Sequence, residues 1–300
     1  MKIGLDIGGS HIAIGVVNDN YELILKEDKD IKISEAKNPE QTLQDNIIML
    51  IESVINRVGE ANVELIGLAF PGNIKNGKIV KAANLNVQNM DIVKILQDKF
   101  NKPVLIRNDA KCAALAEKKI GSIKNFDDAI FLTLGTGIGG AVFMNNNMLV
   151  SKQENGFEIG HMAINTNGPK CTCGRNGCFE TLASMRKLKN DITERLNLSH
   201  NISGKQIQEV LENEKTYILV EDIINTYIQN LAEGLSNLIS IFKPEAISIG
   251  GSFVHYEHIL LDKLNKVLNS SDALFVKDAV PKIVMATLKN EAGIIGATIN

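Results

Sequence analysis

The sequence predicts an α/β protein with two domains, and three observations support this prediction. The chain has 300 residues, which is enough for one large domain or two medium ones. Short apolar strands and segments of helical periodicity follow one another along the chain. A strand, a glycine turn and a second strand occur at residues 3–17 and again at residues 129–144. Such an internal repeat indicates that one structural unit is present twice.

The first half of the chain opens with the first copy of this hairpin. Strands are expected over Ile3–Asp6 and Ile12–Val17, on either side of the turn Gly8-Gly9-Ser10. Residues 41–58 place apolar side chains at helical spacing and predict a helix. The remaining elements expected here are strands over 65–69 and 104–106 and helices over 91–100 and 110–119.

The second half starts with the second hairpin, whose strands 129–134 and 141–144 flank a turn over 135–140. Residues 151–180 are expected to be irregular, and a loop of that length in a compact domain is usually functional. Helices are expected over 184–196, 205–213 and 219–242, then a strand over 246–249, and finally a helix, a strand and a helix. We expect one domain to comprise residues 1–117 and 289–300, and the other to comprise residues 118–288.

Composition and charge exclude several classes of function. The net charge is −3, and the basic residues are scattered rather than clustered, so we expect no nucleic-acid partner. No apolar run approaches the roughly 20 residues of a membrane helix, so we expect no membrane partner. No signal peptide is recognisable, which makes the cytoplasm the expected location.

Both glycine turns suit phosphate binding, because a residue without Cβ lets backbone N–H groups approach phosphate oxygens. The segment Gly135–Gly140 also matches G-x-G-x-x-G. A dinucleotide-binding site would need a helix after this motif, whereas a strand is expected there. A protein kinase would need further motifs that the sequence lacks. Asp6 ends the first strand, where it could hold Mg²⁺ or cap the turn.

Four potential metal ligands lie close together in the sequence. His161, Cys171, Cys173 and Cys178 form the pattern H-x9-C-x-C-x4-C. Three thiolates and one imidazole complete a tetrahedral zinc shell without an open position, which is typical of a structural Zn²⁺ site. The alternative is a group of unrelated cysteines. Cys112 stands apart and is expected in the core.

Two carboxylates flank these ligands. Glu158 precedes His161 by three residues, and Glu180 follows Cys178 by two. Ionised carboxylates accept hydrogen bonds and suit paired sugar hydroxyls, so a metal-fixed loop could present both to a sugar. Each could instead be a solvated surface residue.

Asp109 lies where a predicted strand meets a predicted helix. It could be the helix N-cap. It could also be a general base that removes a proton from a sugar hydroxyl, since phosphoryl transfer needs positioning, Mg²⁺ and one such base. The sequence leaves both roles open.

Together, these segments resemble the ROK family of repressors and sugar kinases over nearly the whole chain. The matching segments, in order, are Asp6–Ser10, Asn108–Ala110, Leu134–Gly140, Glu158–His161 and Cys171–Glu180. The last two segments together are the most specific part of the match.

The resemblance implies an actin-like ATPase (ribonuclease H-like) fold of two domains with a cleft, which binds ATP, Mg²⁺ and a sugar and carries a structural Zn²⁺. It implies that Asp109 is the base acting on the 6-hydroxyl of a hexose. The residues implied to bind the sugar are Gly72, Asn84, Asn108, Asp109, Glu158, His161 and Glu180. The residues implied to bind the nucleotide are Asp6, Gly8, Gly9, Ser10, Thr136, Gly137, Gly250, Gly251 and Ser252. It also implies a homodimer.

The sequence departs from the family pattern at two positions. Ser10 replaces the commoner threonine and keeps its hydroxyl, and Lys111 replaces a frequent asparagine. Glucose is the expected substrate. The alternatives are N-acetylmannosamine, N-acetylglucosamine, fructose and β-glucosides, or a sugar-sensing protein without catalysis. We expect no DNA-binding repressor, because the first motif strand starts at Ile3.

Overall fold

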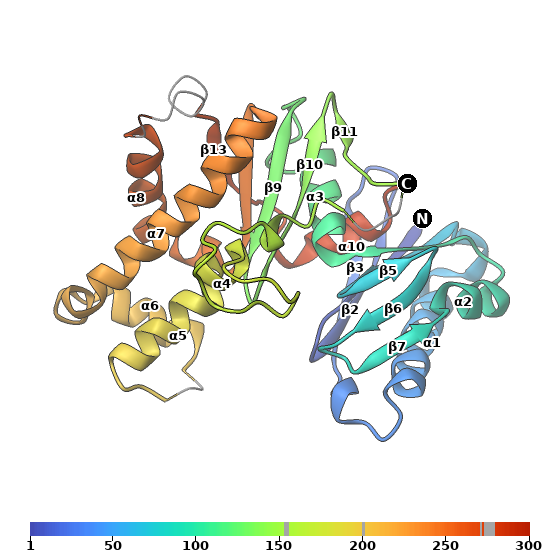
Figure 1. Ribbon diagram of the computed structural model, residues 1–300. Helices are drawn as coiled ribbons and strands as arrows, with labels where there is room; N and C mark the ends of the chain where they lie inside the picture. Colours follow the sequence, from blue (N-terminus) through green and yellow to red (C-terminus); the bar gives the residue numbers. More distant parts are fainter. Residues whose placement is uncertain (153–155, 200–201, 271, 273–279) are drawn as a thin grey trace. The chain divides into compact units, whose positions relative to one another are not determined.

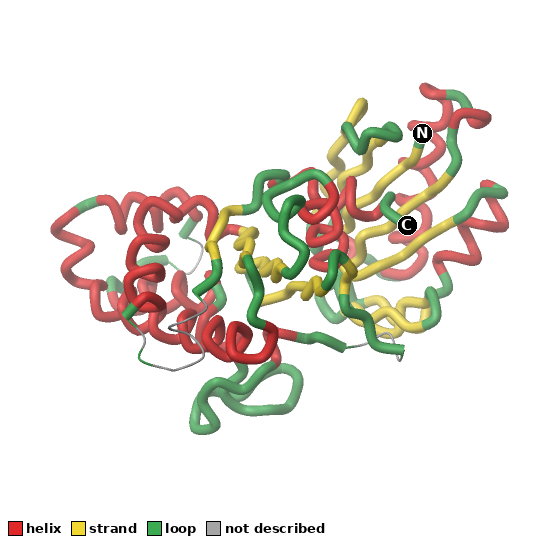
Figure 2. Tube along the Cα trace, turned by 90° about the horizontal axis from the view of Figure 1, so that it is seen from above, coloured by secondary structure: helices red, strands yellow, loops and turns green. Residues whose placement is uncertain are grey.

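The computed structural model describes residues 1–152, 156–199, 202–270, 272 and 280–300. The chain divides into two compact units, and each contains a five-stranded sheet. Unit 1 comprises Met1–Lys124, Val150–Phe157 and Leu288–Asn300, and unit 2 comprises Asn125–Leu149 and Glu158–Thr287. Figure 2 shows strands in yellow with helices in red beside them. The predicted α/β class is confirmed, whereas the expected domain boundaries stay a prediction.

The sheet of unit 1 has the strand order β3-β2-β1-β4-β8. Its strands are β1 (Lys2–Ile7), β2 (His11–Val17), β3 (Leu23–Asp30), β4 (Leu65–Phe70) and β8 (Val104–Asn108). The first three strands pair antiparallel, and β1, β4 and β8 run parallel. The sequence analysis did not predict β3, because none of its residues is fully buried and most are charged. It therefore lacks the apolar periodicity of a core strand.

Helices cover both faces of this sheet. Apolar residues of α1 (Pro39–Val58) and α2 (Ile92–Phe100) share one core cluster with the sheet. On the other face α3 (Asp109–Lys119) and α10 (Ala292–Ala297) lie side by side (Figure 1). A Cβ atom at Gly4 or Gly67 would overlap the backbone of α10. These two glycines therefore let α10 lie directly on the sheet.

A three-stranded sheet in unit 1 was not predicted. It consists of β5 (Asn73–Lys75), β6 (Lys78–Ala82) and β7 (Val87–Met90), all antiparallel. The strands are short and mostly exposed, so their periodicity is weak. Ile79, Val87 and Met90 nevertheless belong to the core of unit 1.

The sheet of unit 2 repeats the sheet of unit 1. Its order is β11-β10-β9-β12-β13. As in unit 1, the first three strands of this order pair antiparallel, and β9, β12 and β13 run parallel. The strands are β9 (Ala129–Leu134), β10 (Ile138–Met144), β11 (Asn147–Met148), β12 (Ala246–Gly251) and β13 (Lys282–Met285). The internal duplication is confirmed. The turn is shorter than expected, because Gly139 and Gly140 already pair with β9.

Helices pack against this second sheet in one large cluster. They are α4 (Phe179–Ala183), α5 (Met185–Arg195), α6 (Gly204–Glu212), α7 (Glu214–Phe242) and α8 (Glu257–Asn269). The helix α7 starts earlier than expected, because the Asn213 side chain accepts from the backbone N–H groups of Lys215 and Thr216. Among the described residues, no helix combines the length and apolar character of a membrane span.

Short 3₁₀ helices complete the chain. They are η1 (Ile33–Glu35), η2 (Glu60–Asn62), η3 (Ile159–His161), η4 (Ser252–Tyr256) and η5 (Lys289–Glu291). Between β11 and α4, where an irregular stretch was expected, η3 is the regular element among the described residues. Residues 153–155 of that stretch lie outside the described residues.

Candidate active site

The carboxyl ends of three parallel strands bring the first group of predicted residues together. In the sheet register Asp6 of β1 lies opposite Ala69 of β4, and Phe70 of β4 lies opposite Asn108 of β8. The turn after β1, Gly72 after β4 and Asp109 after β8 therefore share one edge of the unit 1 sheet. This edge is where ligands bind in open α/β sheets.

Asp6 and Asp109 interact electrostatically at this edge. Burial, the largest cause, and the nearby charge of Asp109 together raise the pKa of Asp6 to about 6, against the lowering effects of His11 and Lys26. Because the charges of these two carboxylates repel each other, a bound cation would relieve the repulsion.

The structure decides whether Asp109 is the helix N-cap. The N-cap of α3 is Asn108, whose side-chain oxygen accepts from the Lys111 backbone N–H at 3.3 Å. Asp109 is the first helical residue, and its Oδ1 accepts from the Ala110 N–H at 2.8 Å. The N-cap alternative for Asp109 is therefore wrong, and its half-buried carboxylate remains the candidate base.

The first glycine turn is closed by its own backbone. Gly8 N–H donates to the His11 carbonyl at 2.8 Å, and Gly9 and Ser10 are exposed. The Asn84 amide nitrogen lies 3.9 Å from the position of a Cβ on Gly9. The turn thus leaves Gly9 and Ser10 accessible beside a polar amide.

Gly72 has a structural reason to be glycine. Its φ of +108° is unfavourable for other residues, and a Cβ would lie 2.5 Å from the Lys81 carbonyl oxygen. This close approach holds the start of β5 against β6. The sugar contact implied for Gly72 stays a prediction.

The corresponding edge of unit 2 holds the second glycine turn. Gly135 N–H donates to the Gly137 carbonyl at 3.0 Å, which closes the turn around Thr136. Gly251 of β12 lies opposite Leu134, and Ser252 Oγ donates to the Leu134 carbonyl at 3.4 Å. The strand pairing therefore places Gly250, Gly251 and Ser252 at the end of β9 from which this turn starts.

Glu180 connects the cysteine loop to this turn. Its Oε2 accepts from the Ile138 backbone N–H at 3.0 Å, and a Cβ at Gly137 would overlap the same carboxylate. Only glycine fits at Gly137 with Glu180 in this position. The sequence did not predict this contact, since the two residues are far apart in the chain.

Glu158 and His161 bracket the short helix η3. The His161 backbone N–H donates to the Glu158 carbonyl at 3.0 Å. A Cβ at Gly160 would overlap the Ile138 carbonyl, so η3 lies directly against β10. Glu158 is exposed and His161 is partly buried.

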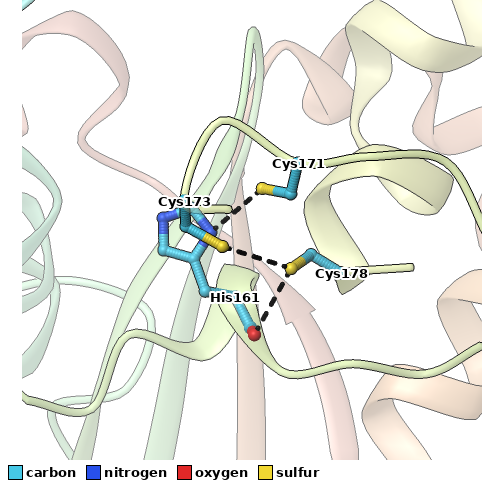
Figure 3. A group of neighbouring side chains, drawn as sticks. All are labelled: His161, Cys171, Cys173 and Cys178. Atoms are coloured by element: carbon cyan, nitrogen blue, oxygen red, sulfur yellow. Dashed lines mark hydrogen bonds between the residues drawn. The ribbon is translucent and has the colours of Figure 1, made fainter. Parts of the chain in front are cut away.

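The four predicted metal ligands converge in unit 2. Figure 3 shows the side chains of His161, Cys171, Cys173 and Cys178 pointing toward one another, and their ligand atoms all lie within 4.8 Å of one another. Cys171 Sγ lies 3.5 Å from His161 Nδ1, and Cys173 Sγ lies 3.6 Å from Cys178 Sγ.

These separations fit a zinc-sized ion. A tetrahedron with Zn–S bonds of about 2.3 Å and Zn–N bonds of about 2.0 Å has edges of about 3.5 to 3.8 Å. Without metal, burial raises the pKa of Cys178 to about 12, while the Arg175 backbone N–H lowers the pKa of Cys173. A divalent cation would hold all three thiols as thiolates. The cluster can therefore bind a metal ion.

The sequence analysis gave no role to His11 or to the contact made by Lys111. His11 lies beside Gly8, because a Cβ on Gly8 would be 2.9 Å from the His11 ring, and its charge influences Asp6. The signal was its position directly after the glycine turn. Lys111 Nζ donates to the Gly156 carbonyl at 3.3 Å.

The duplicated sheets with glycine turns at equivalent edges define a protein of the actin-like ATPase fold. The ROK family profile matches residues 2–299. The chain belongs to the ROK family, as its motifs indicated.

Members of this family with different activities are similar to the chain. It is 32% identical to a xylose repressor of Bacillus spizizenii, over 90% of this chain and 68% of the relative. It is 28% identical to a glucokinase of Thermotoga maritima, over 98% of this chain and 95% of the relative. A ROK family glucokinase from Streptomyces griseus, in complex with glucose and AMPPNP, superposes with a TM-score of 0.79 at 25% identity, over 99% and 97% of the two chains.

Proposed function

We propose that this protein is an ATP-dependent hexose kinase that phosphorylates the 6-hydroxyl of glucose. The observation that carries the proposal is the pair Asp6 and Asp109 at the edge of the unit 1 sheet, next to the turn Gly8-Gly9-Ser10. A kinase needs a base, a carboxylate for Mg²⁺ and a phosphate-binding turn. A protein that only senses a sugar needs no such pair.

Each residue has a role in this proposal. Asp109 accepts the proton of the sugar hydroxyl, and Asp6 holds Mg²⁺, directly or through water. Mg²⁺ neutralises phosphate charge when bound. The residues proposed to bind glucose are Gly72, Asn84, Asn108, Glu158, His161 and Glu180. The residues proposed to bind ATP are Gly8, Gly9, Ser10, Thr136, Gly137, Gly250, Gly251 and Ser252.

Glu180 can serve two purposes in such a reaction. Its Oε2 already accepts from Ile138 N–H at the second glycine turn. A carboxylate has two oxygens with several acceptor positions, so Oε1 can accept from a sugar hydroxyl. Glu180 would then join the sugar to the phosphate-binding turn. We further propose that the Cys₃His cluster binds Zn²⁺ as a structural ion that holds His161 and this loop in place.

The experiment is a coupled assay of ADP release with purified protein, Mg-ATP and a panel of sugars. The panel contains glucose, fructose, N-acetylmannosamine, N-acetylglucosamine, a β-glucoside and xylose. Sugar-dependent ADP release, strongest with glucose, is the expected result, and mass spectrometry of the product identifies the phosphorylated sugar. ADP release that is independent of sugar would count against a sugar kinase.

A sugar-responsive regulator is the second candidate, because several similar relatives are xylose repressors. Calorimetry with xylose and glucose separates the two candidates. Binding of xylose without ADP release from any sugar would favour the regulator. The homodimer and the cytoplasmic location stay predictions, and light scattering after size exclusion tests the first.

A further inference from the structure

Glu117 is a buried carboxylate near the end of α3 to which the proposed reaction assigns no role. Its relative exposure is 0%. Among the residues that the structure describes, it is the one charged side chain classed as buried. Burial of a carboxylate is unfavourable unless hydrogen bonds compensate it. Its partners therefore indicate what this residue does.

One carboxylate oxygen of Glu117 organises the segment after α3. Oε2 accepts from the Ser122 backbone N–H at 2.6 Å and from Ser122 Oγ at 2.7 Å. The backbone carbonyl of Glu117 accepts from Gly121 N–H at 3.1 Å and Ile123 N–H at 3.3 Å. A Cβ at Gly121 would overlap the carboxylate. The chain thus wraps around Glu117 before the first stretch of unit 1 ends at Lys124.

The other oxygen reaches a distant part of the chain. Oε1 accepts from the Leu288 backbone N–H at 2.7 Å, and Leu288 begins the last stretch of unit 1. That stretch continues directly through η5 into α10. Glu117 therefore joins the segment where the chain leaves unit 1 to the segment where it returns for the last time.

The helix α3 contains one candidate catalytic carboxylate, and α10, which follows Leu288 after η5, contacts the other. Asp109 is the first residue of α3. In α10, a Cβ at Gly293 would overlap the Asp6 carboxylate, and a Cβ at Gly296 would overlap the Cys112 carbonyl of α3. Both helices are thus packed closely, with almost no space to adjust. A shift of one against the other would change the separation of Asp6 and Asp109.

We propose that Glu117 is a positioning residue for Asp6 and Asp109: it ties the end of α3 to the start of the α10 segment and so keeps the two carboxylates in register. This inference rests on the proposed kinase function. A displacement of about 1 Å between catalytic groups is enough to reduce turnover about 100-fold.

The test compares wild type with Glu117→Gln in the full-length protein. Glutamine keeps the size but offers one acceptor oxygen, so Ser122 N–H or Leu288 N–H must face an NH₂ group. We expect kcat to fall at least about 10-fold while the KM for glucose stays within about 3-fold. Hydrogen exchange, read by NMR, should become faster at the Ser122 and Leu288 amides.

Two further variants make the comparison specific. Asp191→Asn removes a surface ion pair with Lys187 in unit 2 and should leave kcat unchanged. Ser122→Ala removes the Oγ hydrogen bond to Glu117 but keeps the backbone N–H bond, and it should lower kcat about 2- to 5-fold. If Glu117→Gln does not fold, an unchanged kcat in Ser122→Ala overturns the inference.

The outcomes separate this inference from the proposed function. A Glu117→Gln protein with lower thermal stability and faster exchange but normal kcat would show that Glu117 only stabilises the fold. Absence of any sugar phosphorylation by wild type would instead refute the kinase proposal. The hydrogen-exchange comparison of wild type with Glu117→Gln would still test the inference in that case. Unchanged exchange at the Ser122 and Leu288 amides would show that Glu117 does not join the two segments.

Discussion

At the scale of single residues, the arrangement around Asp109 shows how a helix start can serve chemistry. Asn108 caps α3 by accepting from the Lys111 N–H at N3, and Asp109 Oδ1 accepts from the Ala110 N–H at N2. An aspartate in the first helical turn is also stabilised as an anion by the helix dipole. Because Asn108 and not Asp109 is the N-cap, we propose a catalytic rather than a capping role for Asp109.

Replacing this base should reduce turnover far more than substrate binding. In Asp109→Asn we expect kcat to fall about 10² to 10⁴-fold, the usual contribution of a general base. The dissociation constant of glucose, measured by calorimetry, should change less than about 5-fold, because the amide is similar in size and still accepts hydrogen bonds. A variant with near-normal kcat would remove Asp109 from this role.

The raised pKa of Asp6 predicts a pH-dependent stability in metal-free protein. Its pKa is about 6 in the folded protein against an ordinary value of 3.8. The folded state therefore binds the proton more tightly, and the associated stability is lost as the pH rises through 6. Asn cannot ionise, so Asp6→Asn does not lose this stability. The melting temperature of Asp6→Asn minus that of wild type should therefore increase from pH 5 to pH 8.

The control for this comparison is Asp98→Asn, an exposed aspartate of α2. Its melting temperature should follow wild type at both pH values. Equal behaviour of Asp6→Asn and Asp98→Asn would contradict an elevated pKa at Asp6. Kinetic assays should also show that Asp6→Asn requires more Mg²⁺, since an amide is a weaker ligand than a carboxylate.

At the scale of elements, the cysteine loop depends on a few backbone positions as well as on its ligands. Gly177 has a φ of +64°, and a Cβ there would overlap the Asn165 carbonyl. Gly174 has a φ of +94° but nothing within 4 Å of a Cβ. A side chain would strain the backbone at both positions, but only at Gly177 would it also overlap a neighbouring residue. Gly174 is therefore a suitable control for Gly177.

We expect Gly177→Ala to lose most of its zinc and to melt at a clearly lower temperature. Gly174→Ala should lower the free energy of unfolding only by the backbone strain of a positive φ, roughly 1–2 kcal/mol. It should keep its metal. Zinc content by plasma emission spectrometry and thermal melting measure both effects. Similar zinc content in the two variants would mean that the Asn165 contact does not define the loop.

Loss of one ligand should affect the same element more directly. In Cys173→Ser we expect lower zinc content and lower thermal stability, because metal binding and folding are coupled. Cys112→Ser serves as a control outside the cluster, since Cys112 is buried in unit 1. It should change stability without changing zinc content. Absence of zinc from purified wild-type protein would refute the zinc assignment.

At the scale of the whole molecule, a substrate and a nucleotide should each stabilise the folded chain by mass action. A ligand present at 100 times its dissociation constant adds about 2.7 kcal/mol to the free energy of unfolding. We expect glucose and a non-hydrolysable ATP analogue to raise the melting temperature, and to raise it further together. Xylose at the same concentration should have a smaller effect. A larger shift with xylose than with glucose would favour the regulator.

The duplication also belongs to this scale, and it was readable from the sequence because each copy is local. A strand, a glycine turn and a strand occupy fewer than about 20 residues, so apolar periodicity and glycine positions are enough to recognise them. The third strand of each copy was not recognised. β3 is polar and β11 has two residues, so neither carries a periodic signal, and their place comes from pairing with the neighbouring strand.

The sequence by itself determined the α/β class, the repeat, the ROK family motifs and the Cys₃His ligand set, because each depends on spacing along a short stretch of chain. The tertiary structure alone decided that Asn108 and not Asp109 caps α3, that Asp6 and Asp109 interact, and that Glu180 binds the Ile138 N–H. It also decided that Glu117 joins Ser122 to Leu288. These contacts depend on strand register and on helices that pack across long sequence separations, which local periodicity does not encode.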